Sequence, residues 1–264
     1  MAHDVILYPT RAHLKKYFGG RSRLYPFMEL WNTIDMSRWG PHDFIKKVDV
    51  TYEFGTIQNG TSAAVTGTVA STANGICRLT TGTDDAGYAA IFPNTDAGLE
   101  GATFYGDLSC VMWARVKVNT ITTFKVEIGF TDSDADAGAV NVLATPTATA
   151  TDCAVWVIDT NDAGNPGAWQ GFTVNTGGTP AKVEPDKPAI VAATYEWLGV
   201  AIQGDNVKFM HCDTNGNPDY ESAWQVAAIE GGVALVPWIF AQCSAGSASR
   251  LVDIDYTVAW QRRA

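Results

Sequence analysis

The sequence predicts a nearly all-β domain made of two antiparallel sheets packed face to face. The chain of 264 residues holds 25 Gly and many Thr, Val and Ala but only eight Glu, a composition typical of strands joined by tight turns. Short segments of alternating apolar and polar residues recur along it, separated by Gly, Asn, Asp and Pro. About a dozen such strands favour a sandwich or barrel, and all-β domains often run to roughly 200–250 residues as one unit.

The clearest alternation lies in residues 124–130, where Lys125 and Glu127 share one face and apolar side chains the other. This pattern predicts a half-buried antiparallel strand. Residues 252–260 alternate in the same way and predict a closing strand with one continuous apolar face. The other expected strands are 64–70, 75–81, 88–92, 108–118, 154–158, 171–174, 196–203, 207–212 and 233–241.

The first 50 residues differ from the rest in charge. They hold eight Lys and Arg against five Asp and Glu, a net charge of +3, whereas residues 51–264 hold ten against 23, a net charge of −13. We expect an anchoring arm over residues 1–50 and the sandwich over 51–264. Within the arm, a short helix over residues 11–18 would end at Gly19 and Gly20, and residues 27–39 would form a second short helix or an irregular packed segment. The arm either covers an edge of its own sandwich or docks on another molecule.

The five cysteines are odd in number and form no CxxC pair. Cys77, Cys110 and Cys153 sit in apolar runs, where a free cysteine acts as a small buried hydrophobe. We therefore expect reduced, structural thiols and a reducing compartment. No window holds the 18 or so apolar residues that a membrane helix requires, and the N-terminus lacks the order of a secretory signal.

The sequence offers little catalytic material. It contains no GxSxG, P-loop, GxGxxG or HExxH motif and only four histidines. His211 stands beside Cys212 and Asp213, but successive residues of a strand point to opposite faces, so the run is no triad. We expect no catalytic residue and no cofactor.

One acidic loop is a candidate cation site. Asp132, Asp134 and Asp136 occupy alternate positions after a strand and offer carboxylates to a hard cation such as Ca²⁺. Against the EF-hand pattern, the sixth position is Ala137 rather than Gly and the twelfth is Leu143 rather than Glu. Because Asp also favours turns for local hydrogen-bonding reasons, we expect a solvated turn without a metal.

Two tryptophans are candidates for binding a glycan. Trp156, Trp197 and Trp238 fall within strand patterns, where core packing is expected. Trp169 and Trp224 lie near loops, where an exposed ring face can pack against a sugar ring.

From residue 51 to the C-terminus the chain resembles concanavalin-like jelly-roll domains. The resemblance is carried by the segments 195–209, YEWLGVAIQGDNVKF, and 251–260, LVDIDYTVAW. It implies a two-sheet jelly-roll sandwich with a short, partly helical N-terminal arm. Glycoside hydrolases of that fold carry ExDxxE or ExDxE on one strand, whereas residues 252–256, VDIDY, contain no glutamate. The departure argues against glycosidase activity.

Three segments also resemble virion structural proteins of tailed bacteriophages. They are 75–82, GICRLTTG, 125–132, KVEIGFTD, and 154–161, AVWVIDTN. This resemblance implies a non-enzymatic capsid decoration (cement) protein that binds and stabilises the capsid exterior after synthesis in the host cytoplasm. The alternative is a carbohydrate-binding module of a tail or head fibre that serves host recognition.

The cement interpretation assigns partners to the arm. We expect the major capsid protein or other virion subunits as partners, and a homo-oligomer such as a trimer; we expect neither a membrane nor nucleic acid as a partner. Basic and aromatic side chains would dock the arm across neighbouring subunits. These residues are Arg11, Lys15, Lys16, Tyr17, Phe18, Arg21, Arg23, Tyr25, Phe27 and Trp31.

Overall fold

The computed structural model describes residues 36–42, 54–68, 76–93, 103–133, 138–161, 167–183, 190–246 and 248–262. Within these ranges the chain is almost entirely β, and its one helix is a single 3₁₀ turn, η1 (Gly106–Leu108). No helix of this part of the chain is long and apolar enough to cross a membrane. The helix expected over residues 11–18 lies outside the described residues.

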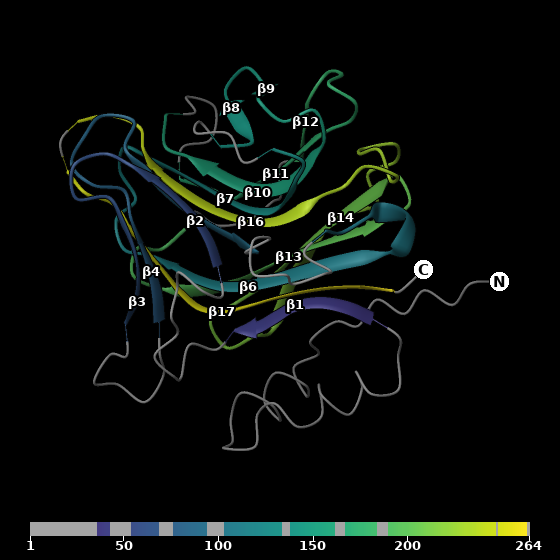
Figure 1. Cartoon of the computed structure of the whole chain (residues 1–264), viewed down its shortest axis with the longest axis horizontal. Helices are drawn as coiled ribbons and strands as arrows, with labels where there is room; N and C mark the ends of the chain where they lie inside the picture. The colour runs from purple at the N-terminus through teal and green to yellow at the C-terminus, as the bar shows by residue number, and fades with distance from the viewer. Residues whose placement is uncertain are drawn as a thin grey trace.

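The described strands form two large antiparallel sheets that stack face to face (Figure 1). The eight-stranded sheet contains, in spatial order, β15 (Pro218–Glu221), β14 (Asn206–Cys212), β13 (Tyr195–Gln203), β6 (Cys110–Val118), β17 (Leu251–Arg262), β4 (Ile76–Thr80) and β3 (Ala64–Thr68), with β1 (Met36–His42) beside β17. The seven-stranded sheet contains β12 (Ala181–Val183), β11 (Gln170–Val174), β10 (Cys153–Asp159), β7 (Phe124–Thr131), β16 (Val236–Cys243), β5 (Tyr88–Pro93) and β2 (Phe54–Asn59). A hairpin of β8 (Val140–Val142) and β9 (Thr147–Ala148) pairs separately. The predicted two-sheet sandwich is confirmed.

A continuous apolar core fills the space between the two sheets. Leu79 and Ile254 contribute to it from the eight-stranded sheet, and Phe130 and Trp156 from the seven-stranded sheet, all four at most 1% exposed. The Trp156 ring meets the Phe209 ring edge to face, with 5.3 Å between centroids. Burial of this apolar area supplies the main driving force for the sandwich.

Strand β7 is buried on both faces, so the half-buried strand expected there is wrong. Lys125 is 3% exposed and Glu127 is fully buried. The segment that leads into the β8–β9 hairpin covers this outer face, and the Glu127 carboxylate accepts the backbone N–H groups of Ala139 at 2.7 Å and Val140 at 3.0 Å. Trp238 donates its indole N–H to the same carboxylate at 3.1 Å. A buried charge is tolerated here because it accepts these hydrogen bonds and pairs with Lys125, whose Nζ lies 3.4 Å from Oε1.

Strand β17 changes faces part-way along, so the expected continuous apolar face is also wrong. The register shifts between Ile254 and Tyr256, which marks a β-bulge. Ile254 lies in the core between the sheets, whereas Tyr256 and Trp260 join a separate cluster on the outer face of the eight-stranded sheet. This outer-face cluster consists of Val111, Trp113, Trp197, Ala201, Met210, Cys212, Tyr256, Val258 and Trp260.

Strand β1 comes from the segment expected to be an arm. It pairs antiparallel with the C-terminal half of β17, from Met36 opposite Arg262 to His42 opposite Thr257, while β4 pairs with the N-terminal half of β17. Residues 36–39 are therefore strand, and not the short helix or irregular segment expected over 27–39. The eight-stranded sheet includes a strand that precedes residue 51.

All five cysteines are free and buried, as predicted. Burial raises the pKa of the Cys77 thiol to about 12, and the nearby Asp253 carboxylate adds to the shift. Such thiols stay protonated at neutral pH and act as small apolar side chains.

Candidate functional site

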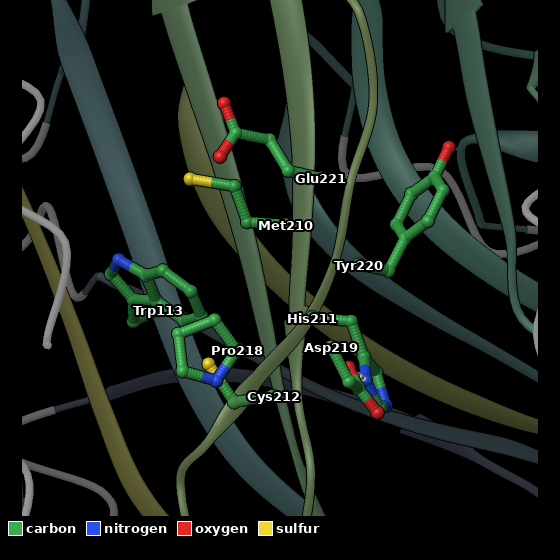
Figure 2. Close-up of a pocket in the computed structure, with 8 residues that line it drawn as sticks. All are labelled: Trp113, Met210, His211, Cys212, Pro218, Asp219, Tyr220 and Glu221. Atoms are coloured by element: carbon green, nitrogen blue, oxygen red, sulfur yellow. Dashed lines mark hydrogen bonds and ion pairs between the residues drawn. The ribbon is translucent and has the colours of Figure 1, made fainter. Parts of the chain in front are cut away.

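A pocket of about 260 Å³ lies at the β15 end of the eight-stranded sheet (Figure 2). It is formed where β14 and β15 make a hairpin beside the indole of a tryptophan from β6. The residues that line it are Trp113, Met210, His211, Cys212, Pro218, Asp219, Tyr220 and Glu221. The lining combines apolar side chains with two carboxylates, a mixture typical of small-molecule sites.

The Trp113 indole reaches the pocket because a glycine stands between its strand and β14. Gly199 on β13 is paired with Trp113 on one side and with Met210 on the other. A Cβ built on Gly199 would lie 2.8 Å from three atoms of the indole, so the ring crosses the backbone of β13 where any other residue would push it away. The indole is 2% exposed and forms one wall together with Met210 and Cys212 of the outer-face cluster.

Two carboxylates of the lining point to opposite faces of the hairpin, Glu221 to the side of Met210 and Trp113 and Asp219 to the side of His211 (Figure 2). The side chain of Glu221 is 42% exposed and that of Asp219 is 36% exposed. Lys208 pairs with Glu221, with 2.5 Å between Nζ and Oε1, and the same ammonium lies 4.9 Å from the centre of the Trp224 ring. Trp224, one of the predicted glycan-binding residues, is half-buried and adjoins the rim through Lys208.

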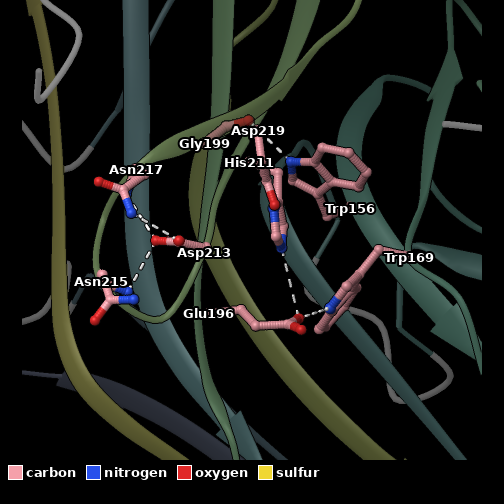
Figure 3. Close-up of polar contacts among 9 residues, drawn as sticks. All are labelled: Trp156, Trp169, Glu196, Gly199, His211, Asp213, Asn215, Asn217 and Asp219. Carbon is pink, nitrogen blue, oxygen red and sulfur yellow. Dashed lines mark hydrogen bonds and ion pairs between the residues drawn. The ribbon is translucent and has the colours of Figure 1, made fainter. Parts of the chain in front are cut away.

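A chain of polar contacts ties Asp219 to the interior of the sandwich (Figure 3). His211 is 5% exposed, and its Nδ1 lies 2.5 Å from Oδ1 of Asp219. Its Nε2 lies 3.6 Å from Oε2 of Glu196, which also accepts the indole N–H of Trp169 at 2.7 Å. The imidazole is thus held between two carboxylates and fixes the position of Asp219.

This array orients a carboxylate and does not resemble a hydrolase triad. The contacts of His211 are with Asp219 and Glu196, while Cys212 belongs to the outer-face cluster on the opposite side of the strand. Nucleophilic catalysis needs a hydroxyl or thiol within hydrogen-bond reach of the base. His211 and Cys212 therefore point to opposite faces of β14, as expected for successive residues of a strand.

The turn between β14 and β15 is closed by its own hydrogen bonds. The Asp213 carboxylate accepts the backbone N–H groups of Asn215 at 2.9 Å and Asn217 at 2.8 Å, and the Asn217 side-chain amide at 2.8 Å. Burial disfavours the ionised form, but the hydrogen bonds from Asn217 and Asn215 outweigh it and lower the pKa of Asp213. The turn fixes the hairpin that carries Asp219 and Glu221.

The candidate cation loop is described only at its start. Asp132 accepts the backbone N–H of Thr151 at 3.2 Å and also its hydroxyl, while Asp134 and Asp136 lie outside the described residues. Within the described part of the chain, no group of three or more His, Cys, Asp or Glu side chains is placed to hold a metal ion.

Trp169 is not the exposed platform that its loop position predicted. Its side chain is 4% exposed and belongs to the core between the sheets, because its indole N–H is drawn inward to Glu196. The ten predicted docking residues of the arm, from Arg11 to Trp31, lie outside the described residues. Sequence reasoning missed Glu196, Asp219 and Glu221. The hairpin signal at 213–218 would have placed 219–221 opposite His211.

The fold is that of concanavalin-like jelly rolls. Peanut lectin superposes with a TM-score of 0.55 at 11% identity, over 86% of this chain and 97% of that one. The carbohydrate recognition domain of Emp47p gives 0.53 at 11% identity, over 86% and 96%. A protein of unknown function from Shewanella oneidensis MR-1 gives 0.58 at 12% identity, over 93% and 97%. No family model and no curated protein matches the chain.

Proposed function

We propose that this protein is a non-enzymatic carbohydrate-binding domain and that the pocket beside the β14–β15 hairpin holds the sugar. The observation that carries the proposal is a pocket of about 260 Å³ in which the exposed Pro218 and the exposed Glu221 carboxylate lie on the same face of the hairpin as the buried Trp113 indole (Figure 2). This is the alternative that the sequence left open beside the cement role.

The chemistry of the lining suits a sugar ring. One face of a pyranose presents C–H groups, which pack against apolar surfaces such as that of the exposed Pro218. Its hydroxyls donate hydrogen bonds, and an ionised carboxylate is the strongest acceptor that a protein offers them. Because Lys208 holds the Glu221 carboxylate in place, little side-chain entropy is lost when the ligand binds.

The related folds support this proposal. They include peanut lectin, a domain named for carbohydrate recognition, and the lumenal domain of VIP36 in a form bound to Ca²⁺ and Man3GlcNAc, which superposes with a TM-score of 0.52 at 12% identity. A carbohydrate-binding function suits a host-recognition module of a tail or head fibre. The virion location and the capsid partner are proposals that rest on the resemblance of segments 75–82, 125–132 and 154–161. The docking arm is a proposal that rests on the basic and aromatic residues between Arg11 and Trp31.

A glycan array probed with the full chain tests the proposal. We expect binding that Glu221→Gln weakens roughly tenfold or more, since losing a hydrogen bond to a charged group costs about 1.5–3 kcal/mol. Glu230→Gln, an exposed acid that does not line the pocket, is the matched control and should bind normally. A blank array, or equal loss in both variants, would contradict the proposal.

A further inference from the structure

We infer that the outer-face cluster of the eight-stranded sheet is the docking face for the chain's own residues 24–35, which directly precede β1. The inference does not depend on the proposed carbohydrate-binding function. It follows from where the cluster lies, how deeply it is buried within one chain, and which sequence enters the sheet beside it. It assigns the aromatic residues of 24–35 to this face rather than to a partner, and it leaves the basic stretch 11–23 available for one.

The outer-face cluster crosses four neighbouring strands. It takes Tyr256, Val258 and Trp260 from β17, Val111 and Trp113 from β6, Trp197 and Ala201 from β13, and Met210 and Cys212 from β14. The seven-stranded sheet packs on the opposite face of these strands, where Val116 and Val200 join the core (Figure 1). A sheet with apolar side chains on both faces needs a covering layer on each of them.

The cluster is covered within a single chain. Val258 is 1% exposed and Trp260 is 5% exposed, values close to those of the core between the sheets. Trp224 packs against the cluster from beside β14, where Gln225 pairs with Val207. Val258 and Trp260 lie three strands away on β17, about 14 Å at roughly 4.8 Å per strand, which is farther than one indole reaches. Another part of the same chain therefore lies over β17.

The segment before β1 has the position, the composition and the length to be that cover. Because β1 pairs with β17 so that Met36 lies opposite Arg262 and Arg38 opposite Trp260, the chain enters the sheet beside the β17 side of the cluster. Residues 24–35 read LYPFMELWNTID and hold seven large apolar or aromatic side chains and no Lys or Arg. Even along a helical path, at about 1.5 Å per residue, this segment spans about 18 Å, enough to reach from β17 to β14.

Other occupants fit this face less well. Residues 43–53 connect β1 in the eight-stranded sheet to β2 in the seven-stranded sheet, so this stretch has to pass from one sheet to the other. A second copy of the chain is not needed, because the cluster is already buried in one copy. A large apolar face left uncovered would promote association and aggregation, which a cover built into the chain prevents.

Cys212 is a native reporter for the cover, because it is the free cysteine that belongs to the outer-face cluster. The full chain is treated with iodoacetamide, and mass spectrometry follows the labelling of each cysteine. We expect Cys212 to be protected in the folded chain. Phe27→Asp combined with Trp31→Asp should raise its labelling rate roughly tenfold or more, because a charge is costly to bury against an apolar face. Cys77, which lies between the sheets, should stay protected in the same variant.

The matched control is Tyr17→Asp combined with Phe18→Asp, which makes the same chemical change outside residues 24–35. This variant should leave Cys212 protected. Rapid labelling of Cys212 in the unaltered chain would overturn the inference, since the face would then be open to solvent. Equal protection of Cys212 in both double variants would overturn it as well, since another segment would then be the cover.

A photo-reactive benzoylphenylalanine at position 27 tests the same contact without adding a charge, and it decides the matter if the aspartate variant does not fold. We expect its cross-links to fall on peptides from β6, β13, β14 or β17. Mixing light and heavy isotope-labelled chains separates contacts within one chain from contacts between copies. Cross-links within one chain to these strands support the inference, whereas cross-links between chains or to the seven-stranded sheet overturn it.

Discussion

Gly199 is the position at which a single methyl group should disturb the candidate site most directly. The Cβ of Gly199→Ala would lie 2.8 Å from Cδ2, Cε2 and Cζ2 of Trp113, whereas carbon atoms pack best at about 3.5–4.0 Å. The ring would have to move by roughly 0.7–1.2 Å. On the other face of the strand, Trp156 donates its indole N–H to the Gly199 carbonyl at 2.9 Å, so the backbone is held and cannot take up the strain.

The expected loss of folding stability follows from this overlap. Forcing extra volume into a packed site typically costs about 1–3 kcal/mol, and Trp113 is 2% exposed. For a domain of this size, each kcal/mol lowers the melting temperature by about 2–4 °C, so a loss of roughly 2–12 °C is expected. Thermal unfolding followed by circular dichroism measures this loss, and binding on the glycan array should weaken in parallel because Trp113 lines the pocket.

Two further variants separate this mechanism from a general intolerance of alanine. At Gly232 a Cβ would meet nothing closer than 3.7 Å, so Gly232→Ala should leave the melting temperature unchanged. Trp113→Phe removes the larger ring, so Gly199→Ala should cost less in the Trp113→Phe background than alone, and the double-mutant cycle should show coupling. Strictly additive effects, or a Gly199→Ala variant within about 0.5 kcal/mol of the parent chain, would refute the overlap argument.

Three other predictions concern two buried carboxylates and the N-terminal arm. Burial disfavours the ionised form of Asp253, but hydrogen bonds from Arg78 and Lys117 outweigh it and lower the pKa of the carboxyl group. The ionised carboxylate therefore stabilises the fold above its pKa in the unfolded chain, and this stabilisation is lost as pH falls through the lower pKa of the folded chain. Asp253→Asn should reduce the free energy of unfolding by roughly 2 kcal/mol at neutral pH, and the urea midpoint of the variant should fall less steeply as pH is lowered. Glu127→Gln should destabilise the chain by roughly 3 kcal/mol and speed hydrogen exchange at Ala139, because an amide oxygen replaces only one of two carboxylate acceptors. Deleting residues 1–30 should abolish co-sedimentation with capsids, and undiminished sedimentation would remove the anchoring idea.

The long strands could be predicted because local alternation and turn residues specify them. The expected segments 154–158 and 207–212 match β10 and β14 to within one residue at each end. The described strands that were missed are β1, β2, β8, β9, β12 and β15. Of these, β2, β12 and β15 lie at sheet edges, and their residues are mostly not buried. An edge strand pairs on one side only, so its sequence carries little of the apolar alternation that identifies a strand.

The two wrong predictions of burial, in β7 and in β17, have one physical origin. Alternation reveals that Lys125 and Glu127 share a face but not what covers that face, and the covering segment around Ala139 and Val140 comes more than ten residues later. In β17 a single inserted residue reverses which side chains point inward, and no composition signal marks the position of the bulge. Both features depend on tertiary contacts that a one-dimensional pattern does not contain.

Only single residues of the candidate site could be predicted, because their arrangement also depends on tertiary contacts. Trp169 lies 27 residues before Glu196, which lies 15 residues before His211. They meet because Trp169 directly precedes β11 of one sheet, while Glu196 and His211 stand on the neighbouring strands β13 and β14 of the other. Gly199 illustrates the coupling best: one face of its backbone supports the Trp113 wall of the pocket, while its carbonyl accepts the Trp156 indole from the opposite sheet. The pocket is therefore built on the same strand that closes the core, so its walls are held by packing before any ligand arrives, and a sugar that fits them should bind with little rearrangement of the sheet.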